Sequence, residues 1–131
     1  MAANEKKIVI VEDNADNRLL VHAILSKRYR LVDYGDGVSA LAAFQDEKPD
    51  LVLLDVSLPG MDGCEVLARM RADARLDDVP VIALTAHAMP GDRDKYLELG
   101  FSDYVAKPIV DVEAFRSIVE SHLRVGESPG A

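Results

Sequence analysis

Short runs of hydrophobic residues alternate along the chain with longer stretches in which hydrophobic residues recur at helical spacing. Residues 51–54 are all aliphatic and end at Asp55, and similar runs cover 8–11 and 79–84. Such a run is typical of a strand that is buried on both faces of a parallel sheet. A weaker strand is predicted at 30–34, and its charged start favours a place near the sheet edge. A last short strand is predicted at 102–106.

Helices are predicted after each of these strands. The first follows Asn14, a favourable N-cap residue, and the others span about 38–47, 64–72, 90–99 and 111–123. We expect Gly100 to end the fourth helix and Asp111 to cap the fifth. The positions expected to face inward are Leu19, Leu20, Ala23 and Ile24 in the first helix, Leu41, Ala42 and Phe44 in the second, Val66, Leu67 and Met70 in the third, and Phe115, Ile118, Val119 and either His122 or Leu123 in the fifth.

This order is one strand–helix unit repeated five times. Since helical crossovers between parallel strands are right-handed, the pattern predicts an α/β fold with a five-stranded parallel sheet and helices on both faces. Five units are too few for an eight-stranded barrel. We therefore expect one domain over residues 6–124, with flexible tails at 1–5 and 125–131.

Composition and charge exclude several kinds of protein. The 131 residues have a net charge of −8 and no basic run, so direct binding of nucleic acid is not expected. No hydrophobic stretch approaches the roughly 20 residues of a membrane span, so membrane insertion is not expected either. A single cysteine, Cys64, excludes an internal disulfide and favours a cytoplasmic location.

Polar residues stand at the ends of four of the five predicted strands. Because the carboxyl ends of parallel strands lie along one edge of the sheet, where open α/β folds bind ligands, we expect these residues to converge. Clustered carboxylates indicate Mg²⁺, which prefers oxygen ligands. A hydroxyl and an ammonium group could bind phosphoryl oxygens, and an aspartate can carry the phosphoryl group itself. The residues are Glu12, Asp13, Asp55, Thr85 and Lys107.

Four segments around these residues resemble the CheY-like receiver domain of two-component response regulators, and the resemblance covers residues 6–124. It implies a flavodoxin-like, doubly wound fold with strand order 2-1-3-4-5. It also implies a phosphoacceptor signalling domain that catalyses only its own phosphotransfer and autodephosphorylation. The matching segments are Val11-Glu12-Asp13-Asn14, Leu54-Asp55-Val56-Ser57-Leu58-Pro59-Gly60-Met61-Asp62-Gly63, Ala83-Leu84-Thr85-Ala86 and Val105-Ala106-Lys107-Pro108-Ile109.

The resemblance implies a role for each residue of the acidic cluster. Asp55 corresponds to the phosphoacceptor, which takes a phosphoryl group from a sensor histidine kinase or a histidine phosphotransfer protein. Glu12, Asp13, Asp55 and the backbone carbonyl of Ser57 correspond to the Mg²⁺ ligands, with Glu12 acting through water. Ser57 and His87 occupy positions that influence how quickly the aspartyl phosphate is hydrolysed.

The resemblance also implies contacts to the phosphoryl group and a conformational switch. Thr85 and Lys107 correspond to residues that contact the phosphoryl oxygens, and the Lys107–Pro108 peptide bond corresponds to a cis bond. Tyr104 corresponds to an aromatic residue that moves inward together with Thr85. This movement would change the surface of the fourth helix, the last strand and the last helix, which would bind a downstream target protein.

Other readings of the same residues stay open. The polar strand ends could be only helix caps and an ion pair, and the chain could be an interaction module that does not depend on phosphorylation. A hydrolase that forms an aspartyl phosphate would need a second acid where Ser57 stands. Since no output domain follows the last predicted helix, we expect a stand-alone receiver, with a piece of a larger regulator or hybrid kinase as the alternative.

Overall fold

The computed structural model describes residues 6–86 and 91–125. Its five strands form one parallel sheet in the order β2-β1-β3-β4-β5, which confirms the predicted fold and strand order. The strands are β1 (Lys7–Val11), β2 (Arg30–Tyr34), β3 (Leu51–Asp55), β4 (Val81–Thr85) and β5 (Asp103–Ala106). The helices are α1 (Ala15–Leu25), α2 (Gly37–Asp46), α3 (Gly63–Arg71), α4 (Asp92–Leu99) and α5 (Val112–Val125). Of the predicted tails, residues 1–5 and 126–131 lie outside the described part of the chain.

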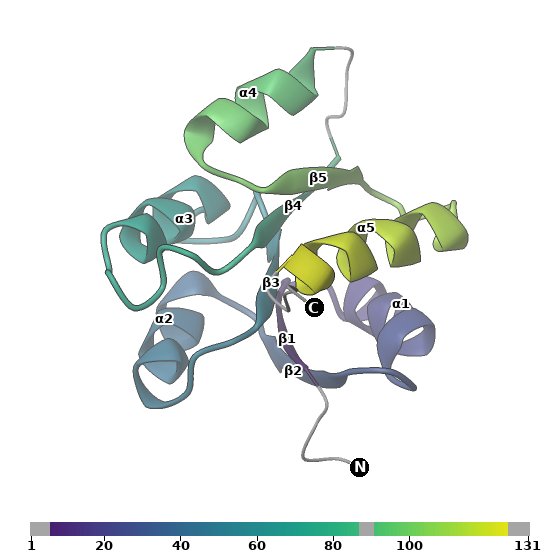
Figure 1. Cartoon of the computed structure of the whole chain (residues 1–131), viewed down its shortest axis with the longest axis horizontal. Helices are drawn as coiled ribbons and strands as arrows, with labels where there is room; N and C mark the ends of the chain where they lie inside the picture. The colour runs from purple at the N-terminus through teal and green to yellow at the C-terminus, as the bar shows by residue number, and fades with distance from the viewer. Residues whose placement is uncertain (1–5, 87–90, 126–131) are drawn as a thin grey trace.

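The helices form two layers, one on each face of the sheet. Figure 1 shows α2, α3 and α4 on one side of the strands and α1 and α5 on the other. Alternate residues of each strand supply the two hydrophobic cores, because successive side chains of a strand point to opposite faces. In β3, Val52 and Leu54 pack with α2, α3 and α4, whereas Leu51 and Leu53 pack with α1 and α5.

The inward faces of two helices differ from those predicted. In α1, Leu19 is 68% exposed and Ala23 is also exposed, whereas Val21, Ile24 and Leu25 are buried. Hydrophobic residues surround much of this helix, so their spacing alone did not select the buried face. In α2, Ala42 is exposed and Leu41 is half-buried, and the buried side chains are those of Ala40 and Phe44.

The predicted inward face of α3 is confirmed, since Val66, Leu67 and Met70 are all buried. In α5, Phe115 and Val119 are buried and Ile118 is half-buried. These two helices each carry a single hydrophobic stripe, so their sequence pattern identifies the face that packs on the sheet.

Helix termini follow the predicted capping residues. The side chain of Asn14 accepts a hydrogen bond from the amide of Asn17 at 3.0 Å, and Asp111 accepts one from Ala114 at 2.9 Å. Gly100 ends α4 with a φ of 113°, a left-handed conformation that favours glycine. These local signals are what set the helix boundaries.

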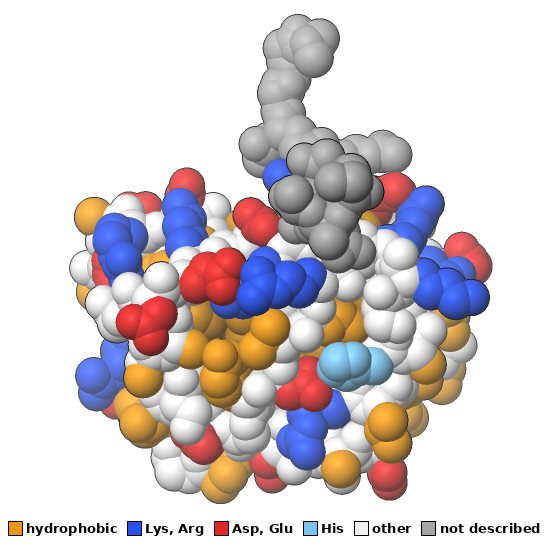
Figure 2. Space-filling model, turned by 90° about the horizontal axis from the view of Figure 1, so that it is seen from below, with side chains coloured by type: hydrophobic (Ala, Val, Ile, Leu, Met, Phe, Trp, Pro, Cys, Tyr) orange, Lys and Arg blue, Asp and Glu red, His pale blue; other side chains and the backbone are white. Residues whose placement is uncertain are grey.

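The molecular surface combines both signs of charge. Figure 2 views the molecule from below, where the edge strand β2 lies in Figure 1, and shows acidic and basic side chains interspersed around hydrophobic ones. At this edge Arg30 forms an ion pair with Glu47 at 3.1 Å, and Nε2 of His22 lies 2.8 Å from Oδ1 of Asp33. Within residues 6–86 and 91–125, no helix combines the length and hydrophobicity that crossing a membrane requires.

Candidate functional site

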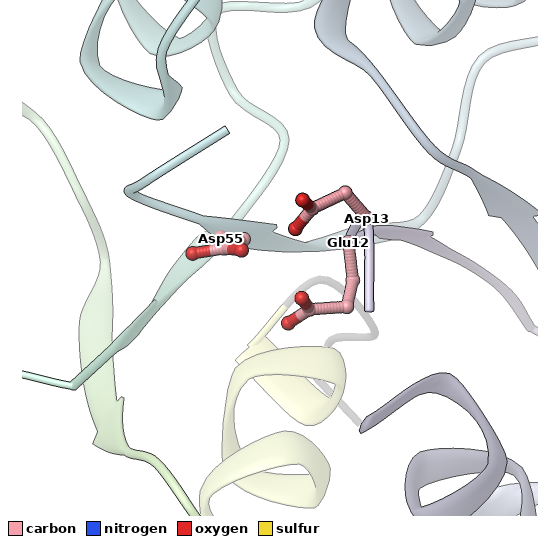
Figure 3. Close-up of side chains that lie close together, drawn as sticks. All are labelled: Glu12, Asp13 and Asp55. Carbon is pink, nitrogen blue, oxygen red and sulfur yellow. The ribbon is translucent and has the colours of Figure 1, made fainter. Parts of the chain in front are cut away.

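Three carboxylates meet at the carboxyl edge of the sheet. Glu12 and Asp13 directly follow β1, and Asp55 ends the neighbouring strand β3. One oxygen from each carboxylate lies within 4.8 Å of the others, and Figure 3 shows both side chains of the β1 end directed toward Asp55. Glu12 and Asp55 are 1% and 2% exposed, whereas Asp13 is exposed to solvent. The cluster is therefore buried on one side and open on the other.

Lys107 joins two of these carboxylates from the other side. Its Nζ atom lies 3.2 Å from Glu12 Oε1 and 3.2 Å from Asp55 Oδ2. β5 brings it there, because the Lys107 amide donates to the Thr85 carbonyl at 2.8 Å and extends the pairing with β4. The Lys107–Pro108 peptide bond is cis. The ammonium group partly balances a concentration of negative charge that would otherwise repel itself.

Backbone amides orient the acidic side chains, and one arginine binds the backbone beside them. The Ser57 amide donates to Asp55 Oδ1 at 2.9 Å, and the Asn14 amide donates to Glu12 Oε2 at 3.1 Å. Arg18 reaches back from α1 and donates to the Glu12 carbonyl at 2.6 Å. Since Asp55 Oδ2 contacts Lys107, both oxygens of Asp55 have a partner that fixes the carboxylate plane.

The charges of the cluster shift two pKa values. Burial raises the pKa of Glu12, and the negative charge of Asp55 raises it further, against the opposing effects of the Asn14 amide and Lys107. Burial by itself would lower the pKa of Lys107, but the charges of Asp55 and Glu12 outweigh it and the pKa is raised. Lys107 is therefore a cation at neutral pH, and its one positive charge faces the carboxyl groups of both Glu12 and Asp55.

Thr85, at the end of β4, belongs to the opposite face of the sheet. Its hydroxyl oxygen lies 3.0 Å from the hydroxyl of Tyr96 on α4, and both residues are buried. Tyr96 packs against Tyr104 of β5, with 5.8 Å between ring centroids and 31° between ring planes. Tyr104 itself is half-buried. Thr85 and Tyr104, the two expected switch residues, are thus connected through a third side chain.

The structure brings together most, but not all, of the predicted site residues. Glu12, Asp13, Asp55 and Lys107 form one cluster, and Ser57 contributes its backbone amide to it. The roles of these residues, and of the Ser57 carbonyl as a metal ligand, stay predictions. His87, and the start of the helix predicted from residue 90, lie outside the described residues.

Three residues near the site were not singled out from the sequence. Tyr96 and Arg18 looked like ordinary helix residues, because their contacts depend on how α4 and α1 pack on the sheet. Gly63 was read only as part of a motif. A Cβ atom at this position would lie 2.4 Å from the Asp55 carbonyl oxygen, so the start of α3 contacts the end of β3 through bare backbone. A glycine directly before a predicted helix was the available signal.

The donor set fits a divalent cation and an incoming phosphoryl group. Carboxylate oxygens are the ligands that Mg²⁺ prefers, and the exposed side of the cluster leaves room for water and phosphate oxygens. Within the described residues, the only cluster of three or more possible metal ligands is this all-oxygen one, so zinc-type ligation by histidine or cysteine is not indicated there. Lys107 adds a fixed positive charge beside the Asp55 carboxylate.

Comparisons with known proteins identify the family of the chain. A family model for the response regulator receiver domain matches residues 8–120. The polar-differentiation response regulator DivK of Brucella anthropi is 36% identical over 119 residues, which cover 90% of this chain and 96% of DivK. The probable transcriptional regulator ycf27 of Cyanophora paradoxa is 41% identical over 130 residues, which cover 98% of this chain. This chain spans about half of ycf27, 53% of its length.

A solved structure shows the same fold with a metal ion present. It is the receiver domain of the sensor histidine kinase PA1611 from Pseudomonas aeruginosa PAO1, with a magnesium ion coordinated in its active-site cleft. The TM-score is 0.81 and the identity 34%, covering 91% of this chain and 98% of that one. The chain therefore belongs to the response regulator receiver domain family, whose members are phosphoacceptor domains of two-component signalling.

Proposed function

We propose that Asp55 accepts a phosphoryl group from the phosphohistidine of a sensor histidine kinase or a histidine phosphotransfer protein. The observation that carries this proposal is the meeting of Glu12, Asp13, Asp55 and Lys107 at one strand edge. An isolated aspartate at a strand end would be a turn residue. An aspartate held between two further carboxylates and a lysine is arranged for phosphoryl transfer.

Asp55 acts as the nucleophile in this reaction. One of its carboxylate oxygens forms a bond to phosphorus while the bond between phosphorus and the donor imidazole nitrogen breaks. The electron pair of that bond returns to the imidazole, which takes a proton from solvent, so no other reactant is needed. The hydrogen bond from Ser57 and the ion pair with Lys107 hold the carboxylate in one orientation, which lowers the entropic cost of the attack.

Lys107 and Thr85 contact the phosphoryl oxygens after transfer. Nζ of Lys107 lies 3.2 Å from Asp55 Oδ2 before transfer, so a small movement of the side chain would let it bind an oxygen of the phosphoryl group afterwards. Thr85 stands on the adjacent strand, where β3 and β4 pair Asp55 with Leu84. A lysine and a hydroxyl close to the same group supply the charge and the hydrogen-bond donor that phosphoryl oxygens need.

Mg²⁺ is the cofactor that fits this cluster. Glu12, Asp13 and Asp55 would hold the ion, Glu12 through water, together with the backbone carbonyl of Ser57. When bound, Mg²⁺ neutralises the carboxylates and screens the charge of phosphoryl oxygens. Without it, the three carboxylates repel both one another and an incoming phosphate.

Phosphorylation would be read by a downstream protein at the surface formed by α4, β5 and α5. A groove of about 500 Å³ lies between β5 and α5 on this surface, and Val110 beside it is 85% exposed. An exposed aliphatic side chain at a groove offers a hydrophobic contact to a protein partner. We infer that Tyr104, which lines the groove, changes its position when Thr85 does.

The aspartyl phosphate would be lost by autodephosphorylation, which is the only other reaction we assign to the domain. Ser57 and His87 occupy the positions that we expect to set its rate. The reducing cytoplasm, where histidine kinases expose their phosphohistidine, suits a chain with one cysteine, and we propose that location.

The experiment that tests the proposal is phosphoryl uptake from phosphoramidate with Mg²⁺, followed by intact-protein mass spectrometry. We expect one phosphoryl group on the wild-type chain and none on Asp55→Asn. Asp46→Asn, which changes an exposed aspartate at the end of α2, is the matched control and should be phosphorylated normally. Equal phosphorylation of Asp55→Asn and the wild type would refute Asp55 as the acceptor.

A further inference from the structure

Two buried hydroxyl groups pair at the carboxyl end of β4. Tyr96 on α4 is 4% exposed and Thr85 at the end of β4 is 3% exposed, and their hydroxyl oxygens are 3.0 Å apart. A tyrosine hydroxyl in such a position is costly to bury unless it has a hydrogen-bond partner. Thr85 supplies a partner, so the pair constrains the rotamer of each side chain.

This pair lies on the opposite face of the sheet from the Asp55 carboxylate. Strand alternation places Thr85 with Ala83, which packs in the core under α2, α3 and α4. It places Asp55 with Leu53, which packs in the core under α1 and α5. To contact a phosphoryl group on Asp55, the Thr85 hydroxyl must therefore turn away from α4 and toward the edge of the sheet.

Turning Thr85 in this way would separate it from Tyr96. Phosphoryl oxygens only accept hydrogen bonds, so the Thr85 hydroxyl would donate its proton to the phosphoryl group and could keep Tyr96 only as a donor to its own oxygen. The turn of the side chain carries that oxygen away from α4, which removes this contact as well. The Tyr96 hydroxyl would then lose a partner while it remains inside the protein. The unphosphorylated state is thus stabilised by a contact that the phosphorylated state does not have.

We propose that Tyr96 is a positioning residue that holds Thr85 in its resting conformation, so that phosphorylation of Asp55 has to break their hydrogen bond. This inference rests on the proposed function of Asp55 and extends it to α4. The Tyr96 ring also packs against Tyr104, 5.8 Å between centroids, and against Phe101 at the same distance. When Thr85 separates from Tyr96, the contacts of Tyr96 on α4 and of Tyr104 on β5 would therefore change together.

Removing the Tyr96 hydroxyl should favour the active conformation. In Tyr96→Phe the resting state loses one hydrogen bond, while the active state no longer buries a hydroxyl without its partner. One net hydrogen bond corresponds to about a two- to tenfold change in the balance between the two conformations. A ligand that selects the active conformation should bind more tightly by the same factor.

Beryllofluoride with Mg²⁺, a mimic of the phosphoryl group, is the probe. Its bound fraction can be measured by fluorine NMR on the full chain. Binding to the wild type and not to Asp55→Asn tests the proposed function by itself. Given that result, Tyr96→Phe should bind beryllofluoride about two- to tenfold more tightly, with the affinity for Mg²⁺ alone unchanged. An affinity equal to or weaker than that of the wild type would overturn the role of Tyr96.

Two further variants separate positioning from general loosening of the fold. Tyr29→Phe removes a tyrosine hydroxyl directly before β2, at the amino end of that strand and so at the opposite edge of the sheet from the acidic cluster, and should leave the affinity unchanged. In a Thr85→Val background, Tyr96→Phe should have no effect, because the hydrogen bond is already absent. If beryllofluoride affinity rose by the same factor in Tyr29→Phe, or on adding Tyr96→Phe to the Thr85→Val background, Tyr96 would not act through Thr85.

A measurement on the wild type does not depend on how any variant at position 96 folds. The chain has four tyrosines, which can all be replaced by 3-fluorotyrosine. Single changes of Tyr29, Tyr34 and Tyr104 to Phe assign the Tyr96 fluorine signal by elimination. We expect this signal to shift when Mg²⁺ and beryllofluoride are added. A Tyr96 signal that stays in place while that of Tyr104 moves would overturn the proposal.

Discussion

Arg71, at the end of α3, should contribute far more to stability than its neighbour Arg69. Its Nε and Nη2 atoms donate to the Gly100 carbonyl at 3.1 and 3.0 Å, and its Nη1 atom donates to the Val79 carbonyl at 2.8 Å. Nη1 also donates a longer hydrogen bond, of 3.2 Å, to the backbone carbonyl of Asp77. One guanidinium group thus joins α3, the segment before β4 and the glycine that ends α4.

The geometry allows a rough estimate of this contribution. A hydrogen bond from a charged donor contributes about 1.5 kcal/mol or more, and Arg71 makes short ones to two separate carbonyls, those of Gly100 and Val79. Allowing for its partial exposure, we expect Arg71→Met to lower the free energy of unfolding by about 2 to 3 kcal/mol. For a domain of this size, that corresponds to a melting temperature about 8 to 12 °C lower. Arg71→Lys should recover little, because lysine cannot bridge several carbonyls.

Urea and thermal unfolding followed by circular dichroism measure this effect. Arg69→Met is the matched control, since Arg69 forms only an exposed pair with Glu65 one helical turn away, at 3.0 Å. Such a pair contributes about 0.5 kcal/mol or less. If Arg71→Met were no more destabilising than Arg69→Met, the carbonyl contacts of Arg71 would not stabilise the fold as we reason.

Three further predictions concern the site and its surroundings. Gly63→Ala should lower the free energy of unfolding by about 1 to 3 kcal/mol and slow phosphorylation, because the new Cβ would lie 2.4 Å from the Asp55 carbonyl oxygen. A variant with the same free energy of unfolding and the same rate of phosphorylation as the wild type would contradict this. Burial, together with the negative charge of Asp62, raises the pKa of the Cys64 thiol, so its alkylation by iodoacetamide should accelerate at a higher pH than that of a free cysteine derivative. If the alkylation rates of Cys64 and of the free cysteine derivative rose over the same pH range, the thiol would not have a raised pKa. Mg²⁺ at ten times its dissociation constant should stabilise the wild type by about 1.4 kcal/mol. Asp13→Asn should stabilise the chelator-treated protein, because one of three repelling carboxylates becomes neutral. The same substitution should reduce the stabilisation that Mg²⁺ adds to the fold. If Mg²⁺ stabilised the variant as much as the wild type, Asp13 would be excluded as a ligand.

The order and type of the elements could be predicted from the sequence because each depends on neighbouring residues. The aliphatic run before Asp55 is buried throughout β3, and Asn14 and Asp111 cap the helices they were expected to cap. Alternating strands and helices then restrict the topology, since right-handed crossovers leave few ways to wind a parallel sheet. The convergence of polar strand ends follows from that topology alone.

Which face of a helix is buried depended on the tertiary structure wherever the hydrophobic pattern was broad. Leu19 was expected to pack inward and is exposed, whereas Val21 is buried. The packing of α1 against the sheet and α5 selects one of several nearly equivalent hydrophobic stripes. In α3, with its single stripe, the choice was already determined by the sequence.

Contacts between side chains at the site were decided by the tertiary structure. Lys107 and Glu12 are 95 positions apart and meet because β5 and β1 end at the same edge of one sheet. The bond between Tyr96 and Thr85 depends on the register of α4 over β4, for which a sequence pattern has no local signal. The residues at the strand ends thus identified the chemistry of the site, and the packing of α4 provided the contact that we expect to control it, because its atoms meet only when helix and sheet are assembled.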